Sequence, residues 1–115
     1  MCMNLIKAGF DVTVHNRSRA AVEEVAKQGA KATNSPKEVA QRSEIVITCL
    51  PSPIEVKQVI FGENGITATM RKGGIVIDTT TVDPLTSRYV ASELEKKELR
   101  LVEAPISGGA IRAKD

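Results

Sequence analysis

The amino-acid sequence predicts an α/β fold, a mostly parallel sheet with helices on both faces. Residues 45–50 and 75–78 are short apolar runs rich in Ile and Val, which is typical of strands buried on both faces. The first run leads at once into a helix start, Ser52-Pro53-Ile54-Glu55, with Ser as N-cap and Pro at the first helical position. Helical patterns alternate with strands along the chain, as in parallel α/β proteins. A buried helical turn is the alternative for residues 45–50, but the run is short and β-branched.

Glycines and cap residues define the elements of the first part of the chain. Gly9 and Gly29 each follow a helical pattern, where glycine commonly ends a helix. Ser18 and Ser35 stand where N-caps are expected, and Pro36 follows the second of them. In order, we predict a helix at 1–8, a strand at 11–15, a helix at 18–28, a short edge strand at 31–33 and a helix at 36–41.

The second part of the chain repeats the alternation after the strand at 45–50. A turn at 62–65 separates two helical segments, and Asp83-Pro84 opens the longest helix. The predicted inward face of that helix consists of Leu85, Tyr89, Val90 and Leu94. In order, we predict a helix at 53–60, a helical turn at 66–70, a strand at 75–78, a helix at 84–97 and a strand at 100–104.

Composition limits the classes of protein that the chain can represent. Its 115 residues, 42% of them hydrophobic, suffice for one domain with a modest core. The net charge of +2 comes from 16 scattered basic and 14 acidic residues, and the few aromatic residues give nucleic-acid binding little support. No apolar run approaches the length of a membrane span, and no signal-peptide pattern is present. Cys2 and Cys49 are too few for a metal site. We expect both cysteines to be reduced, with Cys49 packed in a strand, and the protein to be cytoplasmic.

Polar residues at the end of the first predicted strand suit a dinucleotide. In dinucleotide-binding folds this position meets the adenosine ribose, where an acid binds the ribose hydroxyls and an arginine accommodates a 2′-phosphate. Asn16, Arg17 and Ser18 occupy it, and Arg17 can bind phosphate through two parallel hydrogen bonds. An ordinary surface arginine is the alternative.

Three further segments lie at predicted strand ends. Leu50-Pro51 turns the backbone toward the expected ligand, or is simply a strand terminus. Thr79-Thr80-Thr81 offers hydroxyls to a ribose or carboxamide, or forms a hydrated turn. Ser107-Gly108-Gly109 can place backbone amides around a small anion, or form a plain glycine turn.

The remaining titratable candidates favour structural roles. His15, the only histidine, has no recognisable nucleophile partner and is expected to be a solvated residue at a strand end. Asp78 and Glu103 end strands, but their spacing gives no acid/base pair, and Asp78 is expected to order its own turn.

Six segments together resemble one family over essentially the whole chain. They are residues 1–10, Asn16-Arg17-Ser18, Cys49-Leu50-Pro51, residues 62–66, residues 77–81 and residues 103–109. Their order and spacing resemble the β-hydroxyacid dehydrogenases, which include 3-hydroxyisobutyrate dehydrogenase and 2-hydroxy-3-oxopropionate reductase. More distantly, they resemble 6-phosphogluconate dehydrogenase. The differences, such as Thr80 for Ser and Glu103 for Asp, are mild.

The resemblance implies a Rossmann-like NAD(P)-binding domain over residues 1–115. It implies hydride transfer between NADP(H), with NAD less favoured, and a small β-hydroxyacid or semialdehyde acid. Asn16-Arg17-Ser18 would bind the 2′-phosphate, the backbone of Leu50 and Pro51 would line the cofactor, and Thr81 would contact the nicotinamide half. Ser107, Gly108 and Gly109 would belong to the substrate-carboxylate site.

Two parts of the family pattern have no counterpart in residues 1–115. The first strand and its G-x-G-x-x-G loop would precede Met1, and without that strand the strands at 11–15 and 45–50 are expected to have unpaired edges. The general acid/base lysine and the helical substrate and oligomerisation domain would follow Asp115, and Lys114 does not match that lysine. We therefore expect a partial domain with no catalytic residue, inactive alone, from a parent that forms homo-oligomers. The alternatives are a non-catalytic nucleotide-binding or interaction module and, more weakly, an unrelated flavodoxin-like α/β domain with no preference for NADPH over FMN.

Overall fold

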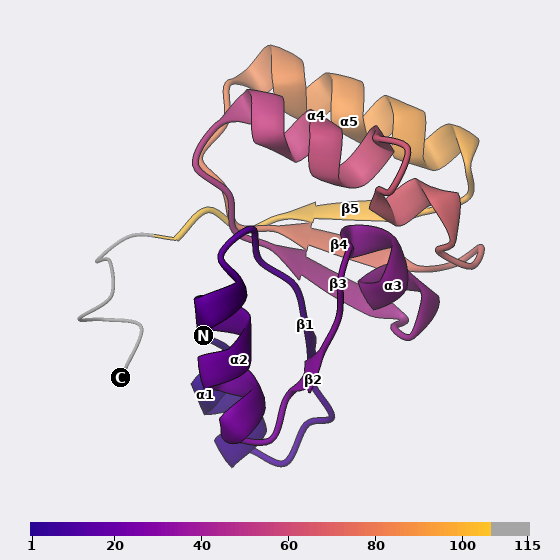
Figure 1. Cartoon of the computed structure of the whole chain (residues 1–115). Coiled ribbons are helices and arrows are strands. Elements are labelled where there is room, and N and C mark those ends of the chain that lie inside the picture. The colour runs from indigo at the N-terminus through magenta and orange to yellow at the C-terminus, as the bar shows by residue number, and fades with distance from the viewer. Residues whose placement is uncertain (107–115) are drawn as a thin grey trace.

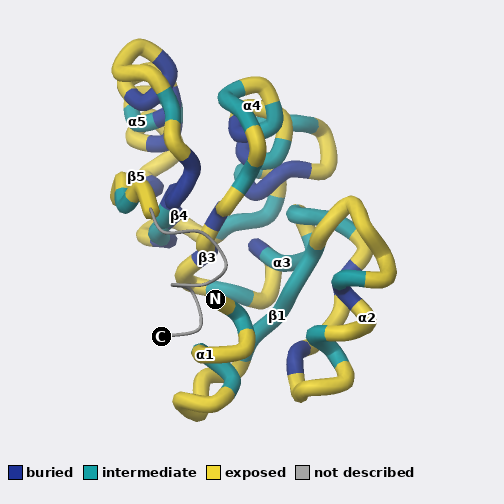
Figure 2. The backbone as a smooth tube through the Cα atoms, turned by 90° about the vertical axis from the view of Figure 1, so that its left-hand side faces the viewer, coloured by how far each residue is buried: buried dark blue, intermediate teal, exposed yellow. Residues whose placement is uncertain are grey.

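The structure, a computed structural model, describes residues 1–106 and contains parallel strands in two sheets (Figure 1). The strands are β1 (Thr13–Val14), β2 (Lys31–Ala32), β3 (Ile45–Thr48), β4 (Ile75–Asp78) and β5 (Arg100–Glu103). β1 pairs with β2, while β3, β4 and β5 form the second sheet in that order. The two-stranded sheet lies on the β3 side of the three-stranded sheet (Figures 1 and 2). The predicted Rossmann-like α/β class is confirmed.

Helices follow the strands at nearly the predicted positions. They are α1 (Cys2–Lys7), α2 (Arg19–Lys27), α3 (Pro36–Gln41), α4 (Pro53–Phe61), the 3-10 helix η1 (Ile66–Ala68) and α5 (Pro84–Lys96). α4 and α5 lie together on one face of the three-stranded sheet, and α2 packs beside β1 and β2 (Figure 1). The strand predicted at 11–15 is shorter than expected, because only Thr13 and Val14 pair with β2.

The hydrophobic core belongs mainly to the three-stranded sheet. β4 is its central strand, and Val76 is fully buried between neighbours on both sides. Figure 2 shows the buried positions concentrated in the elements around this sheet. The largest fully buried side chains of this core are Val56, Ile60, Ile66, Val76, Val90 and Leu94. Burial of these aliphatic groups is the main term that holds α4, η1 and α5 against the sheet.

Both sheets have an open edge, as the sequence predicts. In the described part of the chain, β1 pairs only with β2 and β3 only with β4. The prediction that β3 is buried on both faces is wrong: Ile45 is 55% exposed and Ile47 is 39% exposed. Val46 and Thr48 point to the opposite face, where α4 and α5 lie, and are buried. The other face lacks an equivalent covering layer among residues 1–106.

The inward face of α5 also differs from the prediction. Leu85 and Tyr89 are 75% and 48% exposed. The Tyr89 ring instead packs against α4, where it meets the Phe61 ring edge-on at 5.8 Å between centroids. Lys57 Nζ lies 5.1 Å from the centre of the Tyr89 ring, a cation–π contact. The buried residues of α5 are Thr86, Ser87, Val90 and Leu94.

Cys49 differs from its predicted environment as well. It lies just beyond the last residue of β3 and is exposed rather than packed within the strand. Cys2 is half-buried, and neither thiol forms a disulfide.

Candidate functional site

The carboxyl ends of β1, β3 and β4 lead into the three loops that carry the predicted binding residues. Parallel strands bring such loops to one edge of the fold, where ligands of open α/β sheets bind. Figure 1 shows the loops that follow these strands at the same end of the fold.

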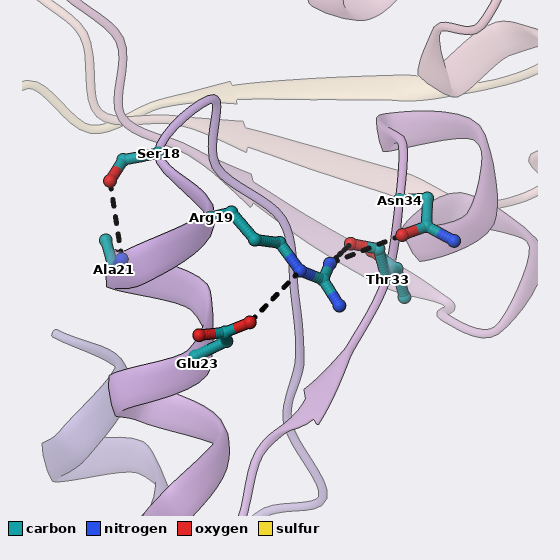
Figure 3. A network of polar contacts seen from close by, with 6 residues as sticks. All are labelled: Ser18, Arg19, Ala21, Glu23, Thr33 and Asn34. Carbon is teal, nitrogen blue, oxygen red and sulfur yellow. Dashed lines mark hydrogen bonds and ion pairs between the residues drawn. The ribbon is translucent and has the colours of Figure 1, made fainter.

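The β1–α2 loop is fixed by local hydrogen bonds that leave Arg17 on its surface. Asn16 Oδ1 accepts a hydrogen bond from the Ser18 backbone N–H at 3.3 Å. Ser18 Oγ in turn accepts from the Ala21 backbone N–H at 3.4 Å, so Ser18 caps α2 as predicted (Figure 3). Arg17 is exposed between these two residues. The loop therefore presents a guanidinium group from an ordered turn.

The neighbouring Arg19 has a different role. Its Nη1 donates to the Thr33 carbonyl oxygen at 3.2 Å and to Asn34 Oδ1 at 3.3 Å (Figure 3). Its Nε lies 3.8 Å from Glu23 Oε1. Arg19 thus ties α2 to the segment after β2, whereas Arg17 forms no close ion pair with any residue of the described chain.

Glu55 lies at the start of α4 and is the acidic member of the site. The Ser52 hydroxyl donates to the Glu55 carboxylate. Ser52 occupies the predicted N-cap position of α4, but its side chain forms no hydrogen bond with the helix backbone. The bond from Ser52 is the largest cause that lowers the pKa of Glu55 below its usual value; a backbone hydrogen bond and the charge of Arg17 lower it further, against burial. Glu55 is therefore a carboxylate held at the helix start by Ser52.

A buried polar network joins the carboxyl ends of β3 and β4. Asp78 is only 4% exposed, and its Oδ1 accepts from Thr48 Oγ1 at 2.9 Å and from the Thr80 backbone N–H at 3.1 Å. Thr80 Oγ1 accepts from the Leu50 backbone N–H at 3.0 Å. Thr79 Oγ1 donates to the Thr48 carbonyl oxygen at 2.8 Å. These bonds satisfy groups that would be costly to bury alone, and they fix both loops. The prediction that Asp78 orders its own turn is confirmed.

Of the three consecutive threonines, only Thr81 is available to a ligand. Thr79 and Thr80 are buried and use their hydroxyls in the network, while Thr81 is exposed. Thr81 and Asp78 line a small cavity of about 80 Å³ at the ends of β4 and β5, which Glu103 also borders. Because the Leu50 N–H is already bonded, the backbone groups that Leu50-Pro51 can still offer are carbonyl oxygens.

The other candidate residues have less defined roles. His15 is half-buried rather than solvated, and its Nδ1 is buried without a hydrogen-bond partner among residues 1–106. Ser107, Gly108 and Gly109 lie outside the described residues. Within the described range, no cluster of three or more His, Cys, Asp or Glu could hold a metal, and no helix is long and apolar enough to cross a bilayer.

A larger hollow, of about 420 Å³, lies at the opposite end of the strands. Arg42 and Glu44 line it before β3, and Arg71 and Lys72 line it before β4. It borders the amino ends of the strands, so it is not where an open parallel sheet binds its ligand.

Sequence reasoning missed two features of the site. Glu55 follows the predicted N-cap Ser52 by three residues, the spacing of a capping box, and was not predicted as a site residue. Its carboxylate accepts from the Ser52 hydroxyl, which the pattern of a helix start does not predict. The Thr48–Asp78 bond had a usable signal, since each of two adjacent apolar strands ends in a polar residue.

Comparison with known proteins identifies the class and then the family. The parallel sheets and the arginine-bearing loop after β1 define a dinucleotide-binding α/β domain. Residues 1–115 match the NAD binding domain of 6-phosphogluconate dehydrogenase, and the chain belongs to that family. The flavodoxin-like alternative is therefore wrong.

Curated relatives include proteins named 3-hydroxyisobutyrate dehydrogenase. The chain is 41% identical over 107 residues to a probable mitochondrial 3-hydroxyisobutyrate dehydrogenase of Dictyostelium discoideum, covering 93% of this chain and 33% of the relative. The chain thus spans about a third of the length of that relative.

Solved structures give the same fold. The 3-hydroxyisobutyrate dehydrogenase of Salmonella typhimurium aligns with a TM-score of 0.90 and 25% identity, over 97% of this chain and 39% of that one. Psf3, in complex with NADP+ and 2-OPP, aligns with a TM-score of 0.88 and 26% identity, over 94% and 38% of the two chains. The chain is an NAD(P)-binding domain related to oxidoreductases.

Proposed function

We propose that the chain is the cofactor-binding part of an NADP(H)-dependent oxidoreductase acting on a small β-hydroxyacid or semialdehyde acid. The observation that carries the cofactor preference is the exposed Arg17 in the ordered loop after β1, where an NAD-specific domain would have an acid. Family membership and the names of the relatives support the reaction class.

Three segments among the described residues would fit such a cofactor. Arg17, with Asn16 and Ser18 beside it, would hold the 2′-phosphate, because a guanidinium binds phosphate oxygens bidentately. Thr81 would contact the nicotinamide half with its exposed hydroxyl, while Leu50-Pro51 would line the cofactor with backbone carbonyls. The bound nicotinamide supplies or accepts the hydride. Ser107, Gly108 and Gly109 remain the proposed substrate-carboxylate residues.

The test of this function is cofactor binding by the full-length gene product and its Arg17→Asp variant. The variant is expected to bind NADPH roughly 10- to 100-fold more weakly, because charge-assisted bonds to the phosphate are lost. NADH binding should be retained, since Asp can accept bonds from ribose hydroxyls. Calorimetric titration of each protein with both cofactors measures the two constants.

Arg71→Asp is the matched control, because it makes the same charge change in an exposed turn before β4, at the other end of the strands. It should leave both affinities unchanged. Equal losses for NADPH and NADH in Arg17→Asp would contradict the 2′-phosphate assignment. Binding without turnover on any hydroxyacid or semialdehyde acid would favour a non-catalytic nucleotide-binding module.

Residues 1–115 alone are proposed to be inactive, with the acid/base lysine supplied by another part of the parent. Substrate-dependent oxidation of NADPH by the purified 115-residue chain would contradict this. We also propose a cytoplasmic, homo-oligomeric parent, although the Dictyostelium relative is named mitochondrial. Cell fractionation and light scattering of the full-length product test these two points.

A further inference from the structure

Two hydrogen bonds of Thr80 join the loop after β3 to the loop after β4. The two strands pair in register, with Thr48 opposite Asp78 at their carboxyl ends. Asp78 Oδ1 accepts from the Thr80 backbone N–H at 3.1 Å, which fixes the first residues of the loop after β4. Thr80 Oγ1 accepts from the Leu50 backbone N–H at 3.0 Å, although these two residues are 30 apart in sequence. Thr80 therefore connects the two loops directly.

Thr80 itself is buried, whereas the residues that follow its two ends of this connection are exposed. Its exposed fraction is 6%, and its hydroxyl oxygen is used by the Leu50 N–H. Thr81, the next residue along the loop after β4, is exposed, and so is Pro51, which follows Leu50. The bond between Thr80 and Leu50 thus sets the distance between two exposed segments that come from different strands.

We propose that Thr80 is a positioning residue for the cofactor, which holds Leu50-Pro51 and Thr81 in the relative placement that the nicotinamide half requires. This inference rests on the proposed function, because that function assigns both segments to the cofactor. Thr80 acts through Leu50 and does not touch the cofactor. Since its bonds lie within the chain, the two segments are ordered before the cofactor binds, and such preorganisation strengthens binding.

The test compares the full-length gene product with its Thr80→Val variant, which keeps the shape of the side chain and removes the acceptor of the Leu50 N–H. NADPH and NADH should each bind roughly three- to tenfold more weakly, because a hydrogen bond that orders the site is lost. The two losses should be alike, since the 2′-phosphate is assigned to Arg17. The fragment 2′,5′-ADP, which carries only the adenosine half, should bind with unchanged affinity. Calorimetric titration measures all three constants.

Thr79→Val is the matched control, because Thr79 is also 6% exposed and lies in the same run of threonines. Its Oγ1 donates to the Thr48 carbonyl oxygen at 2.8 Å, a bond between the strand ends and not to the Leu50 loop. The Thr79 backbone N–H donates to the same oxygen at 2.8 Å, so that oxygen keeps a partner in the variant. All three affinities should be unchanged.

Thr80→Ser is the test of rescue. Serine keeps a hydroxyl oxygen that can accept from the Leu50 N–H, so NADPH affinity should stay within about twofold of the wild-type value. A loss in Thr80→Ser as large as that in Thr80→Val would contradict a role for the hydroxyl.

Amide hydrogen exchange of the wild-type protein tests the same point without a substitution. The Leu50 amide should be protected before any cofactor is added, and NADPH should add little protection there. A Leu50 amide that exchanges freely until NADPH is added overturns the inference, and this measurement stands even if Thr80→Val does not fold.

The outcomes separate this inference from the proposed function. Unchanged affinities for both dinucleotides in a folded Thr80→Val protein overturn the role of Thr80, while the Arg17→Asp result still stands. An equal loss for 2′,5′-ADP, or an equal loss in Thr79→Val, also overturns it, because the effect would then be a general loss of structure. Failure of the wild-type protein to bind either dinucleotide overturns the proposed function and this inference together.

Discussion

The two sheets of the chain differ in how they are held together. The three-stranded sheet has a continuous aliphatic core with α4, η1 and α5, together with the buried Thr48–Asp78 bond. In the two-stranded part, the buried side chains include Val22, Ala30 and Thr33. Its surface contacts are the hydrogen bond from Arg19 to the Thr33 carbonyl oxygen and exposed ion pairs such as Lys31–Asp11. Exposed pairs contribute little stability.

The proposed ligand contacts are divided between these two parts. The proposed 2′-phosphate residue, Arg17, belongs to the part with the smaller core, whereas Thr81 and Leu50-Pro51 belong to the part with the larger one. Ligand-binding segments are commonly drawn from less stable regions of a fold. A cofactor that bridges the two parts would stabilise the weaker one by linkage.

The largest expected effect is the loss of stability when a buried side chain is shortened, tested in each of the two cores separately. Ile60→Ala should destabilise the fold by about 2–5 kcal/mol, because Ile60 is fully buried in the larger core. Val22→Ala, in the smaller core, should cost about 1.5 kcal/mol from the two methyl groups lost. Urea denaturation gives both values. A larger loss for Val22→Ala would reverse the ranking of the two parts.

The buried carboxylate should rank next. Asp78→Ala removes the acceptor for Thr48 Oγ1 and for the Thr80 N–H and should cost about 2–4 kcal/mol. Asp78→Asn, which keeps one acceptor oxygen, should cost less. Amide hydrogen exchange at Thr80 and Leu50 reports the loops directly. Unchanged protection there in Asp78→Ala would show that the network does not fix them.

The smallest expected effect is a pH dependence of stability in the part built on the three-stranded sheet. Asp83 accepts hydrogen bonds from the Thr86 hydroxyl and backbone N–H at the start of α5, and these bonds lower the pKa of Asp83 below the ordinary value of an aspartate. A lowered folded-state pKa gives stability that is complete above the unfolded value and lost as pH falls through the folded value.

Asp83→Asn isolates this contribution. The difference in melting temperature between wild type and variant should be constant above about pH 5 and should shrink as the pH falls below about 4. Ser92→Ala, at an exposed position of the same helix, is the control and should leave the pH profile unchanged. A difference that stays constant down to pH 2.5 would contradict the assignment.

Local signals in the sequence predicted the order and type of the elements. Ser18, Ser35 and Asp83 cap their helices through side-chain hydrogen bonds, as expected from residues that act within one turn. The parallel sheet followed from the alternation of apolar runs and helical patterns. These features depend on neighbours in the chain, so the sequence carries them plainly.

Errors arose where a residue's environment depends on distant segments. Ile45 and Ile47 are as apolar as buried strand residues, but their exposure depends on what lies across the sheet. Tyr89 was placed in the core by helical spacing, yet its ring packs on α4. At the candidate site, the exposed position of Arg17 agrees with its place after a strand, whereas the hydrogen bonds of Thr79 and Thr80 join two strands and required the folded chain.

The open edge of β3 also bears on how the isolated chain behaves in solution. In a parallel strand, alternate residues direct their backbone groups to opposite sides. Since Glu44 and Thr48 bond to the β4 side, Ile45 and Ile47 direct theirs to the open edge. An exposed strand edge with apolar side chains is a template for pairing with other copies. We therefore expect association between copies, rather than thermal unfolding, to limit the concentration at which residues 1–115 stay monomeric.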